Sequence, residues 1–293
     1  TGQYNTAVGN SALICNTTGE SNTAVGYKAL APNTTAGQNT AVGFGSLCLN
    51  TTGCRNTSMG YNSLAVNTTG ICNVSIGRST LDANTTGDFN TAVGNSALSG
   101  NTTADNNTAV GHLSLNANTT GTQNTSLGKG ALQDNTTGTC NIAVGYNSLA
   151  ISTTGSSNVG VGRHALVNLT TGTGNFAFGT GSGEGVPFNV TSENNRAIFG
   201  NNSVTNAYVK VAWTVTSDAR DKMNFESVPH GLDFVNQLQP YKFNFKKSRD
   251  GETPHGNARY GFKAQDILAL EGDNPIIIDN ENEDSLKYNG EAL

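Results

Sequence analysis

The chain has 293 residues and a mass of 30.3 kDa, and only 13% of its residues are charged, about half the share in an average soluble domain. Its net charge of −5 argues against a nucleic-acid partner held by a basic face, and no run of about 18 apolar residues suggests a membrane span. With 35% hydrophobic residues it cannot fill two ordinary cores, yet it has too little charge for charge-driven disorder. The composition therefore favours a repetitive architecture.

A repeat of 17 residues occupies positions 1–179. Glycine recurs at this spacing from Gly9 to Gly179, with an Asn four residues before each, and a Leu four residues after each of the first ten. The unit N-T-A-V-G-x-x-S-L-x-x-N-T-T-G-x-x appears eleven times without insertion. A fixed short period indicates units that stack on one another, and this unit is too short for a pair of helices. The sequence predicts a β-solenoid shaft.

Each column of the repeat has an expected structural role. The segment before each glycine, such as Thr91-Ala92-Val93, has the composition of a short strand. The glycine itself is expected to supply a positive φ or to allow a close approach between coils. For the Asn column we favour an amide ladder or turn caps over ligand binding.

The oligomeric state is predicted from the amount of apolar material. Each unit has two bulky apolar positions, the Val-type residue before Gly and the Leu after it. Burying such a side chain contributes ~1.5–3 kcal/mol, whereas ordering one residue costs ~1–2 kcal/mol. One chain is therefore expected to enclose too little apolar material, and we predict a parallel homotrimer that pools its Val and Leu columns. Eleven coils would form a rod roughly 50 Å long.

The N-T-A-V-G and N-T-T-G units resemble the repeats of viral and phage fibre proteins. They are also similar, more loosely, to the β-roll heads of trimeric bacterial adhesins. The resemblance covers residues 1 to about 179. It implies a trimeric fibre architecture without indicating a receptor.

The composition changes near residue 180. Residues 1–179 carry five basic and five acidic side chains, so the whole net charge lies in residues 180–293. Residues 180–216 are expected to form a connector and a terminal β-segment, with one degenerate unit at 195–200 and a strand-like stretch at 207–213.

From Ser217 onward the pattern predicts a small α+β domain, residues 217–293. Apolar residues at three-residue spacing from Leu232 predict a short helix that Pro240 ends. Aromatic and polar residues alternate over 241–245, which predicts a strand. Asp250-Gly251 predicts a turn. The remaining expected elements are a returning strand at 259–262, a helix at 264–270 and a strand at 276–278.

The stretch T-S-D-A-R-D-K at 216–222 resembles the start of the endosialidase-type intramolecular chaperone of phage tailspikes and fibres. Further matches follow in order, G-L-D-F from 231, P-Y-K-F from 240 and Y-G-F-K-A-Q-D from 260. The resemblance implies a domain that trimerises, nucleates folding of the preceding shaft and often cuts itself off. The family's closing helix would lie beyond Leu293, so we expect this domain to be C-terminally incomplete and the chain to be the C-terminal part of a longer fibre.

The same resemblance places a nucleophile at Ser217, a base at Lys222 and the cut between Thr216 and Ser217. A Ser hydroxyl needs a base to remove its proton, and a Lys can serve if burial lowers its pKa. Attack on the Thr216 carbonyl gives an ester that water opens, in a single turnover. The alternative is a Ser-Asp turn followed by surface charges, with no cleavage.

The main hypothesis is a structural protein of a virion, a phage tail fibre for host attachment. Its expected partners are two further copies, other tail proteins and a host surface receptor or glycan. Two alternatives are a chain that acts chiefly as a self-processing serine/lysine peptidase and a trimeric adhesin on a bacterial surface. We expect no cofactor and no metal, because the five cysteines (15, 48, 54, 72 and 140) lack metal-ligand spacing and favour free thiols.

Overall fold

A computed structural model describes residues 2–185, 189–204, 231–246, 252, 254–272, 277–279 and 287–288. The chain forms two compact units, Thr1–Asn202 and Ser203–Leu293.

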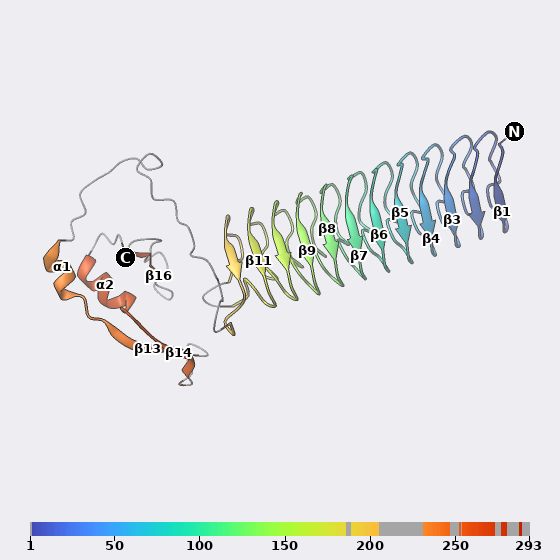
Figure 1. The fold of residues 1–293 in the computed structure, drawn as a ribbon. Helices are drawn as coiled ribbons and strands as arrows, with labels where there is room; N and C mark the ends of the chain where they lie inside the picture. The colour runs from blue at the N-terminus through green and yellow to red at the C-terminus, as the bar shows by residue number, and fades with distance from the viewer. Residues whose placement is uncertain are drawn as a thin grey trace. The chain divides into compact units, whose positions relative to one another are not determined.

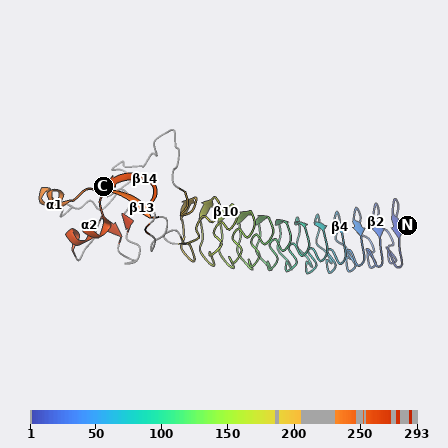
Figure 2. The ribbon, with the colours of Figure 1, turned by 90° about the horizontal axis from the view of Figure 1, so that it is seen from below.

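The first unit is a β-solenoid. Its coils stack in sequence order, and their strand arrows lie side by side along one side of the stack in both ribbon views (Figures 1 and 2). The twelve strands form one parallel sheet in the order β1 to β12. Their bounds are β1 (Thr6–Val8), β2 (Thr23–Val25), β3 (Thr40–Val42), β4 (Thr57–Met59), β5 (Val74–Ile76), β6 (Thr91–Val93), β7 (Thr108–Val110), β8 (Thr125–Leu127), β9 (Ile142–Val144), β10 (Val159–Val161), β11 (Phe176–Phe178) and β12 (Ala197–Phe199).

The register follows the sequence repeat. Thr6 pairs with Thr23, and every step from β1 to β11 has the same 17-residue offset. The last step is longer, because Phe176 pairs with Ala197. The predicted β-solenoid is confirmed, and the degenerate unit at 195–200 supplies its twelfth strand.

From β2 to β12 the middle residue of each strand is buried in the solenoid, and its two neighbours are more exposed. In β2, Ala24 is buried while Thr23 and Val25 are only half-buried, and the same pattern holds to β12. The Leu column after the glycines also lies inside, and nine of its members, Leu30 to Leu166, are fully buried. The apolar core therefore consists mainly of the Leu column, the small middle-position residues and several alanines that directly precede a column leucine, such as Ala29 and Ala97.

The expectation that one chain cannot bury its own Leu column, so that several chains must pool it, is wrong. Leu30 is 0% exposed within one chain, so the interior needs no partner chain to bury its leucines. The Val column lies outside, because a strand of three residues has one inward position, and the small residue takes it. One chain closes its own core because Asn side chains, and not further apolar ones, fill the remainder.

Two Asn columns form this polar part of the interior. In one, the backbone N–H of Asn56 donates to Oδ1 of Asn39 at 2.9 Å, and Nδ2 of Asn39 donates to the carbonyl of Gly53 at 2.9 Å. In the other, Nδ2 of Asn50 donates to that same carbonyl at 2.9 Å and to Oδ1 of Asn33 at 3.1 Å. Buried amides satisfied in this way avoid the cost of unpaired polar groups. The expected ladder is confirmed.

The repeated glycines have the two properties expected of them. Gly94 has φ +133°, and a Cβ there would lie 2.6 Å from the carbonyl oxygen of Gly111 in the next coil. Backbone of adjacent coils fills the space that a side chain would need. The turn after the glycine is left-handed as well, since the Leu column has φ between +48° at Leu132 and +54° at Leu98.

The second unit is small and mixed. Its elements are α1 (Leu232–Gln237), β13 (Tyr241–Lys246), β14 (Pro254–Gly261), α2 (Ala264–Glu271), β15 (Ile278–Asp279) and β16 (Lys287–Tyr288). The strands β13 and β14 pair antiparallel, as do β15 and β16. The predicted helices and the predicted hairpin are confirmed; the expected Asp250-Gly251 turn lies outside the described residues. The core of this unit contains Phe234, Ile267, Ile277 and Ile278.

Candidate functional site

The predicted cleavage residues lie outside the part of the chain that the structure describes. Thr216, Ser217 and Lys222 fall between the described residues 204 and 231. The structure therefore neither brings Ser217 and Lys222 together nor separates them. Their assignment stays a prediction from the sequence, and the described residues on either side of them provide the context.

The hairpin of the second unit carries a shallow aromatic cavity. Its volume is about 350 Å³, and it is lined by Tyr241, Lys242, Phe243, Phe262, Lys263 and Gln265. Nζ of Lys263 lies 4.1 Å from the centre of the Tyr241 ring. This cation–π contact joins the start of strand β13 to the residue that precedes helix α2. The lining residues include no carboxylate, histidine, serine or cysteine that could pair with the lysines, so we assign the cavity no chemistry.

Helix α1 buries one side chain and exposes its other apolar residues. Phe234 packs in the core, whereas Leu232 and Val235 are 74% and 55% exposed. On the hairpin, Phe245 and Tyr260 are exposed too. These four apolar side chains therefore lie on the surface of the unit and outside its core. The spacing of Leu232 and Val235 predicted the helix but not which face is buried.

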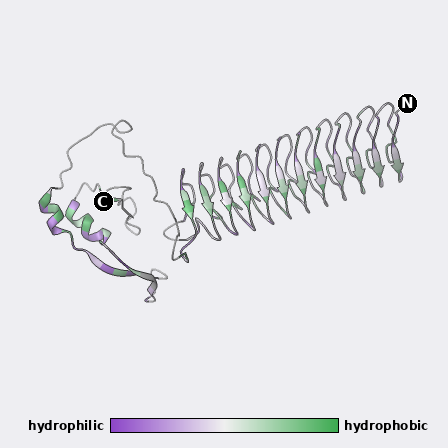
Figure 3. Cartoon of the chain, viewed as in Figure 1, coloured by the Kyte–Doolittle hydropathy of each residue, from purple (hydrophilic) through white to green (hydrophobic). Residues whose placement is uncertain are grey.

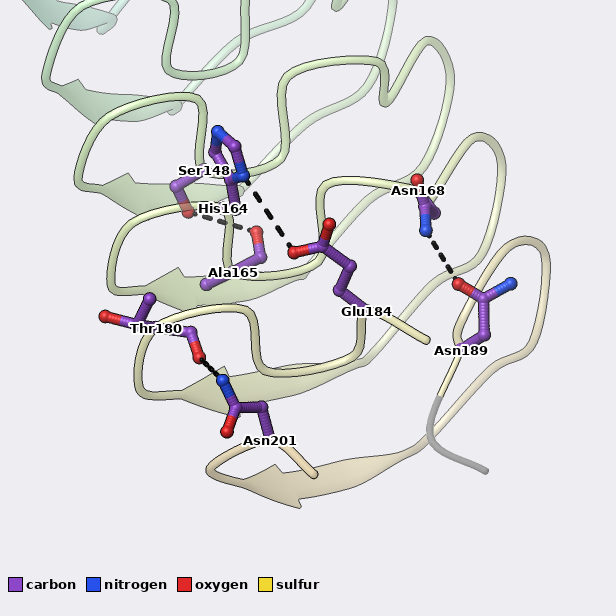
Figure 4. Close-up of polar contacts among 8 residues, drawn as sticks. All are labelled: Ser148, His164, Ala165, Asn168, Thr180, Glu184, Asn189 and Asn201. Atoms are coloured by element: carbon purple, nitrogen blue, oxygen red, sulfur yellow. Dashed lines mark hydrogen bonds and ion pairs between the residues drawn. The ribbon is translucent and has the colours of Figure 1, made fainter. Parts of the chain in front are cut away.

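The end of the solenoid contains several polar contacts between coils (Figure 4). Nδ1 of His164 lies 3.9 Å from a carboxylate oxygen of Glu184. Ser148 is close by in Figure 4, but its hydroxyl donates to the Gly160 carbonyl at 2.8 Å and contacts the Ala165 carbonyl at 3.4 Å. A nucleophilic serine must donate to its base, so these three polar residues form no catalytic triad.

Contacts across the lengthened coil tie β12 to the rest of the shaft. Nδ2 of Asn168 donates to Oδ1 of Asn189 at 2.7 Å, and Nδ2 of Asn201 donates to the Thr180 carbonyl at 2.8 Å (Figure 4). Both pairs are 21 residues apart. The Asn column that includes Asn39 also continues across the insertion, because the backbone N–H of Arg196 donates to Oδ1 of Asn175 at 2.9 Å. These contacts therefore have a structural role.

An aromatic stack on the shaft is a feature that sequence reasoning missed. The rings of Tyr27 and Phe44 are stacked with centroids 5.0 Å apart, and those of Phe44 and Tyr61 with centroids 5.2 Å apart. All three residues follow a repeat glycine, so their spacing in the sequence was a usable signal. Because each ring faces the next, the stack presents ring edges to solvent, and its contacts stabilise adjacent coils.

We find no metal centre in the described residues, which contain no group of three His, Cys, Asp or Glu side chains able to hold an ion. The five cysteines are free thiols. Burial raises the pKa of the Cys48 thiol. In the same part of the chain, no helix has the length and apolar character needed to cross a membrane.

Comparison with known proteins gives one match. Residues 217–273 match the family described as chaperone of endosialidase. No curated protein and no solved structure matches the chain significantly. The match begins at Ser217 and includes Lys222, the two residues singled out from the sequence. A chaperone-of-endosialidase domain that follows a β-solenoid shaft fits a tail-fibre-like protein.

Proposed function

We propose that this chain belongs to a homotrimeric virion fibre, a phage tail fibre used for host attachment, and that its chaperone-like domain acts as an intramolecular chaperone. The observation that carries the proposal is the order of the two parts. A solenoid of twelve strands comes first, and the chaperone match at residues 217–273 follows it.

A repetitive shaft gives such a chaperone a physical task. Neighbouring coils are nearly identical, so chains displaced by one 17-residue step would present nearly the same contacts to one another. Register is weakly specified in such a structure, and assembly of long-range β-contacts is slow. A trimeric domain at the C-terminal end would fix the alignment of three chains before the shafts associate.

The exposed apolar residues of the second unit support its self-association. Leu232 on α1 and Tyr260 on β14 are 74% and 80% exposed. Side chains of this kind cluster at the centres of protein interfaces. Light scattering on the full-length chain is expected to give the mass of a trimer, and a monomeric mass would refute this part of the proposal.

We further propose that the chain cuts itself once between Thr216 and Ser217. Lys222 takes the Ser217 hydroxyl proton, and the oxygen attacks the Thr216 carbonyl carbon. The peptide C–N bond breaks as the C–O bond of an ester forms, and the Ser217 nitrogen takes the proton from Lys222 and leaves as an amine. Water then hydrolyses the ester, restoring the serine hydroxyl and leaving a carboxylate on Thr216. Severing the chaperone after assembly would make the folded shaft hard to unfold.

Intact mass and denaturing gels of the full-length protein test the cleavage. We expect the wild type to give fragments 1–216 and 217–293, and both Ser217→Ala and Lys222→Ala to remain whole. Ser227→Ala is a matched control from the same segment and should be cut like the wild type. An uncut wild type would refute self-cleavage and leave the trimer proposal standing. Cleavage without trimerisation would instead favour a chain that acts chiefly as a self-processing peptidase.

The location is tested separately, by seeking the chain in purified virions. Recovery in virions, together with loss of host adsorption when antibody covers the shaft, is the expected result. Recovery only from a bacterial cell-surface fraction would refute the virion assignment and favour the adhesin alternative.

A further inference from the structure

The outward side chains of the solenoid's strands form one continuous surface. These are the first and third residues of β1 to β12, from Thr6 and Val8 at one end to Ala197 and Phe199 at the other. We name this surface the outer sheet face. Residues of this face include Val8, Met59, Leu127 and Phe178, which are between 42% and 58% exposed.

The outer sheet face carries no charge. Its 24 residues are all Thr, Val, Ile, Leu, Met, Phe or Ala. The ten charged residues of positions 1–179 all lie elsewhere on the coil, at Glu20, Lys28, Arg55, Arg78, Asp82, Asp88, Asp105, Lys129, Asp134 and Arg163. Solvent-exposed protein surfaces usually carry interspersed charged side chains and no large uncharged apolar patch. A face that excludes charge over twelve strands, while its flanks carry charge, has the composition of a surface that becomes covered.

Apolar character increases toward the C-terminal end of this face. Most first positions up to β8 are Thr, whereas those of β9, β10 and β11 are Ile142, Val159 and Phe176. The later strands are correspondingly greener in the hydropathy view (Figure 3). At the end, the ring of Phe176 contacts those of Phe178 and Phe199, with centroids 5.6 and 5.3 Å apart. The C-terminal end therefore offers the largest gain on burial.

We propose that the outer sheet face is the surface along which copies of this chain pack, parallel and in register, with its phenylalanine end as the anchor. This inference rests on the proposed homotrimer and names the part of the shaft that faces the common axis. An identical copy fits the face better than another partner does, because an uncharged surface offers no charge pattern for a different protein to complement. Parallel packing follows from the gradient, since only that arrangement sets the phenylalanines against one another.

The area of the outer sheet face is smaller than that of a complete protein–protein interface. Twelve strands spaced 4.8 Å apart and a width of roughly 10 Å give about 500 Å² per copy, at the upper end of the patches that monomers expose. A standard interface buries roughly 800 Å² per partner. During assembly the face therefore adds to contacts made by the C-terminal unit, and the two together align the shafts.

Lysine substitutions in the full-length protein test the face. Phe178 and Phe44 form a matched pair, because they are 42% and 48% exposed, but only Phe178 belongs to the outer sheet face. We expect Phe178→Lys to raise the dissociation constant of the oligomer at least tenfold, the effect of about 1.4 kcal/mol. Phe44→Lys should leave the constant unchanged. Val8→Lys, at the Thr-rich end of the face, should have a smaller effect than Phe178→Lys. Circular dichroism checks that each variant stays folded.

The outcomes separate this inference from the proposed function. If the wild type is a trimer and Phe178→Lys leaves its dissociation constant unchanged, the face is not the contact, while the homotrimer stands. If the wild type is monomeric, both fail. A folded Phe44→Lys variant that dissociates as much as Phe178→Lys would also overturn the assignment to this face.

Cysteine cross-linking tests the orientation. In a background with the five native cysteines changed to serine, Thr23→Cys near the N-terminal end should form covalent dimers on oxidation, because parallel copies bring identical residues together. Asn95→Cys, off the face, should not. Cross-linking at Asn95 but not at Thr23 would overturn the proposed packing, and so would an absence of Thr23 cross-links in a trimeric sample.

Discussion

The buried Asn column breaks between Asn135 and Ser152. From Asn33 to Asn135, each Nδ2 donates to Oδ1 of the Asn in the preceding coil, the last of these bonds running from Asn135 to Asn118 at 2.8 Å. In the next coil Ser152 takes the Asn position, and its side chain is too short to continue the column. Oδ1 of Asn135 and Oγ of Ser152 are consequently buried without a hydrogen-bond partner.

Extending the column should stabilise the shaft. In Ser152→Asn the new amide can donate to Oδ1 of Asn135 and to the Gly155 carbonyl, leaving one unpaired oxygen in place of two. A net hydrogen bond contributes about 1 kcal/mol, so the thermal unfolding midpoint should rise by a few degrees. Ser152→Ala, the control, removes a hydroxyl without a partner and should change stability little. A large loss in Ser152→Ala would show that this hydroxyl is bonded after all.

The repeat glycines should not tolerate even one methyl group. Gly94→Ala combines φ +133° with a Cβ 2.6 Å from a carbonyl oxygen of the next coil. The strain should cost about 2–4 kcal/mol, measured as a fall in the unfolding midpoint. The neighbouring Asn95→Ala is the control and should behave like the wild type. Equal stability of the two variants would mean that adjacent coils can separate at little cost.

A glycine at position 96, two residues after Gly94, should stabilise the shaft. Ser96 has φ +51°, and glycine already occupies the equivalent position at Gly45, Gly130 and Gly181 with φ near +63°. Ser96→Gly removes the Cβ from a residue in the left-handed conformation, so it should stabilise the shaft by about 0.5–1 kcal/mol. Ser96→Ala also loses the hydroxyl but keeps the Cβ, so it should not gain. Chemical denaturation compares the three proteins, and an equal gain in both variants would contradict the backbone explanation.

The lengthened coil should loosen at acid pH. Burial raises the pKa of Glu193, but hydrogen bonds from backbone N–H groups of Thr191, Glu193 and Ser192, and the nearby Arg196 charge, outweigh this and lower it below its ordinary value. A lowered folded-state pKa stabilises at pH values above the unfolded pKa, ~4.3 for Glu, and this contribution is lost as pH falls through the folded-state value.

Hydrogen exchange at the Thr191 amide measures this effect. Protection should be full near neutral pH and should decline below about pH 4, where protonation of Glu weakens its hydrogen bond. In Glu193→Gln the carboxylate is absent at every pH, so protection should be lower throughout and without that decline. A wild type and a variant with the same pH profile would refute the role of Glu193.

The sequence predicted most of the solenoid because its period allows only one stacking register. It did not predict which strand residue faces inward, since a strand of three residues gives too short an alternation to judge. The middle position was the usable signal: in β1 to β11 it is only Ala, Ser or Gly, as expected where side chains meet the Leu column. In the C-terminal unit the helix at Leu232 was predicted, but its exposed apolar residues were not, because three-residue spacing alone does not show which side of a short helix faces the core. Ser217 and Lys222 came from resemblance, and the described residues do not include them.

The step from β11 to β12 differs from every earlier one, since Phe176 pairs with Ala197 across 21 residues. In a stack whose other steps are interchangeable, this longer one abolishes translational symmetry. If two parallel copies were displaced by one coil, the 21-residue step of one copy would lie beside a 17-residue step of the other. At every other coil the displaced copies would match. The longer coil therefore marks one position in the shaft, and every other coil can be identified by its distance from it.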